Sequence, residues 1–388
     1  MAPNRQESIQ CGAKDRYDRE QGLMETLRQQ SKPDLRALTG LRGIAAWFVV
    51  LYHIRVGMSG FLPEPIMSFL AKGYLAVDFF FLLSGFVMWL SYSERFKSSG
   101  YGYFLPFYWR RIARIWPLHL AIMVGTIAFV LLLITTDRTT MGYPLNELPL
   151  QILLLQNWGF TSELAWNHPA WSISTEMAAY LVFPILAVTI RWNNFSSSVL
   201  LGLVGLIALL IHAYFFQRGH VTLGSDIPQT GLFRCVMQFI IGTILCVLWK
   251  RWRENWVIAG YFGAAGITLI AGFVLSGDYE TLLVPVAFSC LVLASAILAE
   301  AGNNPLACRA LHYLGETSYA TYLTHFMLFI WFKIIFVDDP QNISPLLVTL
   351  FLGVTFLTSA ILYHWVEKPG QKLFLQPSQN KHKVVTAD

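Results

Sequence analysis

The sequence predicts an all-α protein, a bundle of about ten transmembrane helices with both termini in the cytosol. Of its 388 residues, 55% are hydrophobic and only 13% are charged, whereas soluble domains carry about 25% charged residues. The charges are gathered in short clusters between long apolar runs. In a bilayer each backbone polar group needs a partner inside the protein, and a helix provides one. The sequence lacks the basic face with interleaved aromatic residues that indicates nucleic-acid binding.

Ten apolar runs are long enough to approach or cross a hydrocarbon core of roughly 30 Å. They lie at 39–57, 73–92, 115–134, 170–190, 198–216, 232–249, 257–275, 281–299, 312–337 and 345–366. The further apolar stretch 148–158 is too short to cross easily, and we expect it to be interfacial or re-entrant.

The basic residues indicate the orientation of these runs. If the N-terminus is cytosolic, 21 Lys and Arg residues fall in cytosolic segments and 4 fall on the opposite face. This is the bias that the positive-inside rule expects, and an odd number of helices would break it. We therefore expect a polar cytosolic tail at 1–36, a membrane domain at 37–370 and a polar cytosolic tail at 371–388.

The first run, LTGLRGIAAWFVVLYHIR, carries Arg42 and His53 within its apolar stretch. Arg42 and His53 are eleven residues apart, which is three helical turns plus about 20°, or roughly 16 Å along the axis. They are therefore expected on one face, with Arg42 at the cytosolic end and His53 deep in the outer half. The plainer interpretation is a snorkelling arginine and an interfacial histidine.

Two carboxylates enter the membrane from the outside at a depth similar to that of His53. Asp78 lies near the start of the second run, and Glu176 lies near the start of the fourth, one turn after Ser172. Ionisable residues inside membrane helices are costly and mark a functional site by default. A histidine near a carboxylate is suited to taking a proton from a hydroxyl group. A buried structural ion pair and the proton relay of a transporter are the alternatives.

A basic cluster marks the cytosolic start of the third run. Arg110, Arg111 and Arg114 lie there, and Arg111 and Arg114 share a face. Paired guanidinium groups suit phosphate oxygens because they donate bidentate hydrogen bonds. Ordinary positive-inside anchoring is the alternative. Arg234, inside the sixth run, has no partner that the sequence identifies.

Five blocks of the sequence resemble the acyltransferase-3 family of polytopic membrane enzymes, in the same order and spacing. They are RGIAAWFVVLYH (42–53), GYLAVDFFFLLSGFV (73–87), YWRRIARIWPLH (108–119), NHPAWSISTEMAAYLVFP (167–184) and GETSYATYLTH (315–325). The resemblance covers residues from about 35 to 370. Any one apolar block is weak, because apolar segments mimic each other easily, but five in register are specific.

The resemblance implies acylation of sugars and other hydroxyl-bearing acceptors. The family's Arg-x10-His element, whose histidine is catalytic, is matched by Arg42 and His53. Its Arg-x-x-Arg element for the acyl donor is matched by Arg111 and Arg114, and its WSxSxE acid falls on Glu176. Acetyl-CoA is the usual donor, and glycans bound for the cell surface are common acceptors.

Together, these observations predict an O-acyltransferase in the bacterial cytoplasmic membrane. It would transfer acetyl from cytosolic acetyl-CoA, or another acyl group from its CoA thioester, to a hydroxyl of a glycan, without a metal. The expected donor-binding residues are Arg42, Arg111 and Arg114. His53, oriented by Glu176 or Asp78, would take the proton of the acceptor. Candidate acceptor-binding or site-lining residues are Trp171, Ser172, Tyr322 and His325.

Three alternatives to this prediction stay open at the level of sequence. The acceptor could be a small molecule or a lipid, with an acyl group other than acetyl. The chain could be a proton-coupled transporter or flippase, although it lacks the internal repeats and paired broken helices of many transporters. It could also be a structural subunit whose intramembrane charges only pair with each other.

Overall fold

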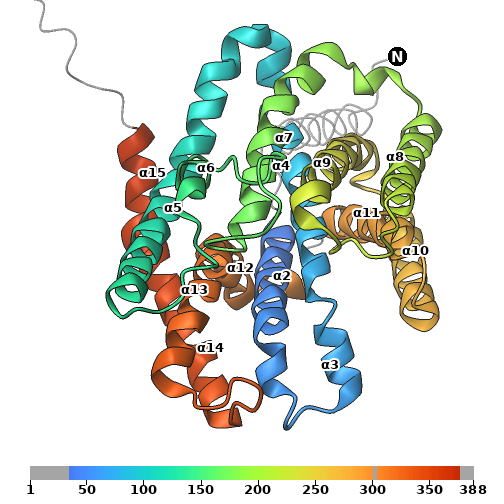
Figure 1. Ribbon diagram of the computed structural model, residues 1–388. Helices are drawn as coiled ribbons and strands as arrows, with labels where there is room; N and C mark the ends of the chain where they lie inside the picture. Colours follow the sequence, from blue (N-terminus) through green and yellow to red (C-terminus); the bar gives the residue numbers. More distant parts are fainter. Residues whose placement is uncertain (1–34, 300–303, 376–388) are drawn as a thin grey trace, which may run out of the picture. The chain divides into compact units, whose positions relative to one another are not determined.

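The computed structural model describes residues 35–299 and 304–375, and within them all regular structure is helical. Nine stretches are long and apolar enough to cross a membrane. One of these, Glu64–Thr135, contains two long helices, α4 and α5, so the described chain has ten long helices. They are α2 (Arg36–Ile54), α4 (Ala76–Ser99), α5 (Phe104–Thr135), α7 (Ala170–Thr189), α8 (Ser197–Gln217), α9 (Ile227–Trp252), α10 (Trp256–Ser276), α11 (Glu280–Leu298), α13 (Ser318–Phe336) and α14 (Pro345–Leu362) (Figure 1).

The predicted polytopic all-α fold is confirmed, because each of the ten apolar runs coincides with one long helix. The stretch 148–158 does not cross the membrane as a helix. It forms α6 (Leu148–Leu153), whose six residues rise only about 9 Å. Leu154 then ends the helix in the left-handed region, with φ of 58°.

Three further short helices complete the described chain: α3 (Glu64–Leu70), α12 (Arg309–Glu316) and α15 (Lys368–Leu375). A π-helical turn at Tyr363–Glu367 joins α14 to α15, and α15 packs along α5, beside which it is drawn in red (Figure 1). The Trp109 indole donates a hydrogen bond of 2.8 Å to the Phe374 carbonyl. Residues 371–375, expected in the C-terminal tail, are therefore part of a packed helix. Of the N-terminal tail predicted at 1–36, Arg36 is already the first residue of α2. The remaining parts of the predicted tails at 1–34 and 376–388 lie outside the described residues.

The helix starts follow from local chemistry. The Ser196 side chain accepts a hydrogen bond from the Val199 N–H at the start of α8, and Asn255 accepts one from Ile258 at the start of α10. Such caps satisfy backbone donors that have no partner within the helix. At the other end of α10, Gly277 takes a φ of 73°, which glycine adopts without steric cost.

The helices differ in how much of their surface the protein covers. In the most apolar 18-residue segment of each helix, 72% is buried inside the protein for α9 and 17% for α10. We infer that α9 is interior and that α10, which packs mainly on α11, faces lipid. The α9 helix packs extensively against α4. At this crossing, a Cβ added to Gly242 would collide with the Leu82 carbonyl oxygen, and one added to Gly85 would collide with that of Phe239. Small residues let membrane helices approach this closely.

Replacing Gly242 with alanine is therefore expected to destabilise the protein by about 1–3 kcal/mol, since the obstructing atoms are backbone and cannot turn away. Gly205→Ala on α8 is the matched control, because a Cβ there meets nothing within 4 Å. That variant should be neutral or slightly more stable, as alanine favours helix more than glycine does. Thermal unfolding of the two purified variants in one detergent checks this. Equal midpoints would show that the crossing is not tightly packed.

Candidate active site

A cavity of about 320 Å³ lies among α2, α4, α5, α7 and α13, and Gln371 of α15 also lines it. Six of the ten side chains singled out from the sequence line this cavity: Arg42, Arg111, Arg114, Ser172, Glu176 and Tyr322. They come from four helices that are far apart in sequence. The other four, His53, Asp78, Trp171 and His325, are not part of its lining.

The three arginines of the cavity are held differently. The Arg111 Nη2 donates to the Tyr92 hydroxyl over 2.6 Å, and its guanidinium carbon lies 5.0 Å from the centroid of that ring. The Arg42 Nη2 donates to the Ser318 hydroxyl over 3.3 Å. Arg114 makes no hydrogen bond or ion pair with any residue at 35–299 or 304–375. Its donors are therefore available to a ligand in the cavity.

No carboxylate in the described ranges forms an ion pair with any of these three arginines. A membrane cavity with cationic groups that lack paired carboxylates is suited to an anionic ligand. Phosphate oxygens match such groups best, because a guanidinium donates two parallel hydrogen bonds to them. The prediction that Arg111 and Arg114 act together thus has a structural basis, since both side chains reach one cavity.

Glu176 also lines the cavity, but it does not contact His53. The Ser84 hydroxyl donates to its Oε1 over 2.5 Å, and the Tyr180 hydroxyl donates to the same oxygen. The expected role of Glu176 in orienting His53 therefore does not match the structure. The physical reason is that Glu176 lies on the face of α7 that meets α4, and α4 supplies Ser84.

Ser172 and Tyr322 form a hydrogen-bonded pair in the cavity wall. The Ser172 hydroxyl donates to the Pro169 carbonyl over 3.1 Å. Its oxygen lies 2.8 Å from the Tyr322 hydroxyl. Because the single hydrogen of Ser172 is already donated, Tyr322 is the donor in this pair. The contact joins α7 to α13 and turns the Tyr322 ring toward the cavity.

His53 meets a second histidine, His325 of α13. The Nδ1 of His53 lies 2.9 Å from the Val49 carbonyl and 3.1 Å from the Nε2 of His325. The two ring centroids are 4.9 Å apart. His325 is fully buried, whereas His53 is partly exposed. The His325 ring in turn lies 6.1 Å from the ring of Tyr322, so the histidine pair sits directly behind the cavity wall.

Aromatic rings surround His53 on its other sides. Tyr52 lies 5.0 Å and Phe326 5.6 Å from its ring centroid, both nearly at right angles to it. Phe326 is stacked on His168 at 4.6 Å. His168 belongs to the connection between α6 and α7, where burial lowers the pKa of its imidazole, so that it is neutral at neutral pH. The side chains in ring contact with His53 are thus aromatic or imidazole, and the Arg55 guanidinium carbon lies 4.2 Å from the centroid of the Tyr52 ring.

Comparison with known proteins shows the family to which the chain belongs. The acyltransferase domain of the acyltransferase-3 family matches residues 35–365. The chain belongs to this family. It is 29% identical over 330 residues to the acyltransferase MdmB of Streptomyces mycarofaciens, which covers 76% of this chain and 79% of MdmB. It is 25% identical over 370 residues to the O-acetyltransferase OatA of Staphylococcus aureus, which covers 87% of this chain but 57% of OatA. No solved structure matches it significantly.

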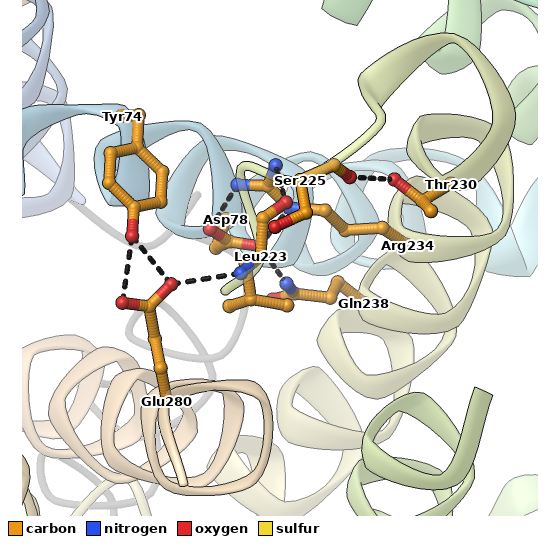
Figure 2. Close-up of polar contacts among 8 residues, drawn as sticks. All are labelled: Tyr74, Asp78, Leu223, Ser225, Thr230, Arg234, Gln238 and Glu280. Carbon is orange, nitrogen blue, oxygen red and sulfur yellow. Dashed lines mark hydrogen bonds and ion pairs between the residues drawn. The ribbon is translucent and has the colours of Figure 1, made fainter. Parts of the chain in front are cut away.

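In this acyltransferase-3 chain, Asp78 lies in a different cluster from the one expected (Figure 2). The Arg234 Nε donates to its Oδ1 over 2.7 Å, and Arg234 Nη2 and Gln238 Nε2 also donate to this carboxylate. Asp78 and Arg234 are 0% and 1% exposed. The expectation that Asp78 orients His53 therefore does not match the structure. Asp78 faces α9 and compensates the buried charge of Arg234, which the sequence had left without a partner.

Glu280 is a polar group of this cluster that sequence reasoning missed. It is 2% exposed and accepts hydrogen bonds of 2.6 and 2.8 Å from the Tyr74 hydroxyl and the Leu223 N–H (Figure 2). It also pairs with Lys72 at 3.1 Å. It lies one residue before the predicted run 281–299, outside the runs in which ionisable residues were sought. The sequence feature that could have drawn attention to Glu280 is its position directly before an apolar run that starts with threonine.

Trp171 belongs to the same region as the Asp78 cluster. The guanidinium carbon of Arg234 lies 5.6 Å from its ring, and Phe81 lies 5.9 Å from it. Trp171 thus packs behind the residues that line the cavity.

Among residues 35–299 and 304–375, no three His, Cys, Asp or Glu side chains gather in a way that could hold a metal ion.

Proposed function

We propose that this membrane acyltransferase transfers acetyl from cytosolic acetyl-CoA to a hydroxyl group of a cell-surface or exported glycan. The observation that carries the proposal is the cavity itself, with three arginines in its lining and with Tyr322, the neighbour of the His53–His325 pair, in the same lining. The name of OatA, an O-acetyltransferase, supports acetyl as the group transferred. The strong bias of basic residues supports a bacterial cytoplasmic membrane with both termini in the cytosol.

The proposed donor site uses the arginines for the phosphates of coenzyme A. Arg114, with Arg111 and Arg42, would hold these phosphates at the end of the cavity predicted to face the cytosol. The pantetheine arm would then extend through the cavity toward Tyr322. The helical spacing puts Arg42 and His53 roughly 16 Å apart along the axis of α2. A long, narrow thioester can reach from one to the other. Because His53 lies behind the lining, the proposal requires the bound thioester to pass Tyr322.

In the proposed chemistry, the Nε2 of His53 takes the proton of the acceptor hydroxyl as its oxygen attacks the thioester carbonyl. A carbon–oxygen bond forms, the carbon–sulfur bond breaks, and coenzyme A leaves as a thiolate. His53 then returns the proton to this thiolate. In the alternative route, the Nε2 of His53 attacks the thioester, a carbon–nitrogen bond forms and the carbon–sulfur bond breaks; the acceptor oxygen then attacks this acyl-imidazole, a carbon–oxygen bond forms, the carbon–nitrogen bond breaks, and the acceptor proton passes to the released thiolate. Glu176, fixed by Ser84 and Tyr180, would contribute to the electrostatics of the cavity without touching His53.

The direct test uses the full chain, purified and reconstituted in vesicles, with acetyl-CoA as the donor. Release of the coenzyme A thiol is followed, and surface glycans of cells with and without the chain are compared by mass spectrometry. Thiol release and an added acetyl group on a glycan are expected. A glycan profile that does not depend on the chain would refute the glycan acceptor, and absence of thiol release with every acyl-CoA tried would refute the donor.

The arginine site makes a separate prediction. Arg114→Gln is expected to raise the KM for acetyl-CoA by about 10- to 100-fold, the equivalent of one charge-assisted hydrogen bond of about 1.5–3 kcal/mol. The rate at saturating donor should change by only a few-fold, because the arginine is distant from the bond that breaks. Arg110→Gln is the matched control, since Arg110 is exposed and lies outside the cavity. Equal KM changes in both variants would mean that general surface charge, rather than the cavity, attracts the donor.

A further inference from the structure

We propose that His325 is a positioning residue that holds His53 in the tautomer with its Nε2 unprotonated and available to the substrates. The inference rests on the proposed function, in which His53 is the proton acceptor. It assigns a specific task to His325, which the sequence named only as a candidate acceptor-binding or site-lining residue. The hydrogen-bond partners of the two imidazoles determine which nitrogen of each ring carries a hydrogen.

His325 comes first, because its own partners are fixed. Its Nδ1 lies 3.1 Å from the Thr321 carbonyl oxygen, one turn earlier in α13. A carbonyl oxygen only accepts hydrogen bonds, so the Nδ1 of His325 carries the hydrogen. In a neutral imidazole the other nitrogen is then a hydrogen-bond acceptor. The Nε2 of His325 therefore presents a lone pair to His53.

The Nδ1 of His53 has two neighbouring hydrogen-bond acceptors. Its Nδ1 faces the Val49 carbonyl at 2.9 Å and the Nε2 of His325 at 3.1 Å. Both neighbours are acceptors, so the Nδ1–H tautomer satisfies them and the opposite tautomer would leave three lone pairs facing each other. The Nε2 of His53 is left without a hydrogen, and no side chain or carbonyl of the described residues bonds to it. It is the nitrogen that can take a proton.

The alternative assignment, a charged His325 that donates to His53, is disfavoured by the surroundings. His325 is 0% exposed. The rings within about 6 Å of the two imidazoles belong to Tyr52, Tyr322 and Phe326, and no carboxylate of the described chain bonds to either histidine. A charge buried without a counter-ion is strongly penalised. The Nδ1 of His53 would also then face the Val49 carbonyl without a hydrogen between them.

The position of His325 explains why a second histidine serves here in place of a carboxylate. The family's acidic residue, Glu176, bonds to Ser84 and Tyr180, and Asp78 bonds to Arg234. Neither is available to orient the His53 ring. A neutral imidazole fixed by its own helix supplies an acceptor of defined direction without adding a buried charge. It acts through His53 and need not contact either substrate.

The test compares His325→Leu, which removes the acceptor, with His325→Gln, whose side-chain oxygen can accept from the Nδ1–H of His53. Thr324→Val is the matched control, since Thr324 is a neighbouring buried residue whose hydroxyl has no partner. The probe is acetyl-CoA with water as the acceptor, and release of the thiol by the purified full chain gives kcat and KM. His325→Leu should lower kcat by about 100-fold or more, with KM changed less than about 3-fold. His325→Gln should recover at least about 10-fold of that loss, and Thr324→Val should match the wild type.

Nitrogen NMR of the wild-type protein with labelled histidine adds a measurement that needs no variant to be stable. The signals of His53, identified by their loss in a His53→Gln sample, should show hydrogen on Nδ1 and none on Nε2. A hydrogen on Nε2 would overturn the inference, as would wild-type kcat in His325→Leu. Equal, low kcat in the Leu and Gln variants at normal thermal stability would also overturn it. Failure of the proposed function differs from all of these, because the wild type itself would then release no thiol.

Discussion

Replacing His53 with alanine is expected to lower acyl transfer by about 100- to 10,000-fold, the usual contribution of a positioned general base. The protein should fold normally, since His53 is partly exposed and its polar contacts are limited to the Val49 carbonyl and His325. Binding of coenzyme A should be nearly unchanged, because the arginines lie at a distance of roughly three helical turns. Thiol release from acetyl-CoA and the binding of free coenzyme A, measured on the same sample, check this.

The matched control is His364→Ala. His364 is an exposed histidine whose Nε2 lies 3.3 Å from the Tyr313 hydroxyl, and it is outside the cavity. Its replacement should leave thiol release within about 2-fold of the wild type, since a surface substitution changes little. Undiminished transfer by a folded His53→Ala protein would end the proposal that this imidazole takes the proton. Equal losses in both variants would point to a general effect on the fold.

Replacing Arg234 with methionine is expected to cost about 3–5 kcal/mol of stability, the usual effect of removing one partner from a buried ion pair. The variant leaves Asp78 at 0% exposure without its counter-charge, although Gln238 still donates to it. Because a neutral pair of similar volume is tolerated, the double variant Arg234→Met, Asp78→Leu should recover most of this loss. Thermal unfolding in one detergent gives the three stabilities, and kcat per folded molecule should stay within a few-fold.

The pair of Lys72 with Glu280 supplies the comparison. Lys72 is 41% exposed, and Glu280 keeps its hydrogen bonds from Tyr74 and Leu223 when the lysine is lost (Figure 2). Lys72→Met should therefore cost no more than about 1 kcal/mol, as for other exposed ion pairs. If Arg234→Met were no worse than Lys72→Met, the Asp78 pair would not stabilise the bundle. A selective loss of activity at full stability would instead give Asp78 a direct role in the reaction.

The sequence predicted the helices well, because hydropathy follows from the bilayer and needs no tertiary knowledge. Each apolar run became a helix, and the short stretch 148–158 did not cross. The sequence also grouped Arg42, Arg111 and Arg114 as expected donor-binding residues, because each belongs to a motif with a fixed place on its helix. All three line one cavity in the structure. These results depend on local spacing or on the resemblance to a family, and both can be recognised in the sequence without knowledge of the tertiary structure.

The partners of the intramembrane charges were not predictable in the same way. Similar depth in the membrane suggested that Asp78 and Glu176 would meet His53, but depth says nothing about the direction in which a side chain leaves its helix. Asp78 points to α9, and Glu176 bonds to Ser84 of α4. Arg234 and Asp78 could have been paired by charge alone, since each is costly without the other. The contact of His53 with His325 depends on the packing of α2 on α13, which no pattern in either helix encodes.

The close crossing of α4 and α9 bears on how the proposed acyl donor would reach the cavity. A Cβ added at Gly85 or Gly242 would meet a backbone oxygen of the other helix, so α4 and α9 are in close backbone contact and we expect the side of the cavity on α4 to move least. The opposite side is built on α5, which is joined to α15 by surface contacts such as that between Trp109 and Phe374. We therefore expect the proposed donor to enter between α5 and α15, where Gln371 lines the cavity.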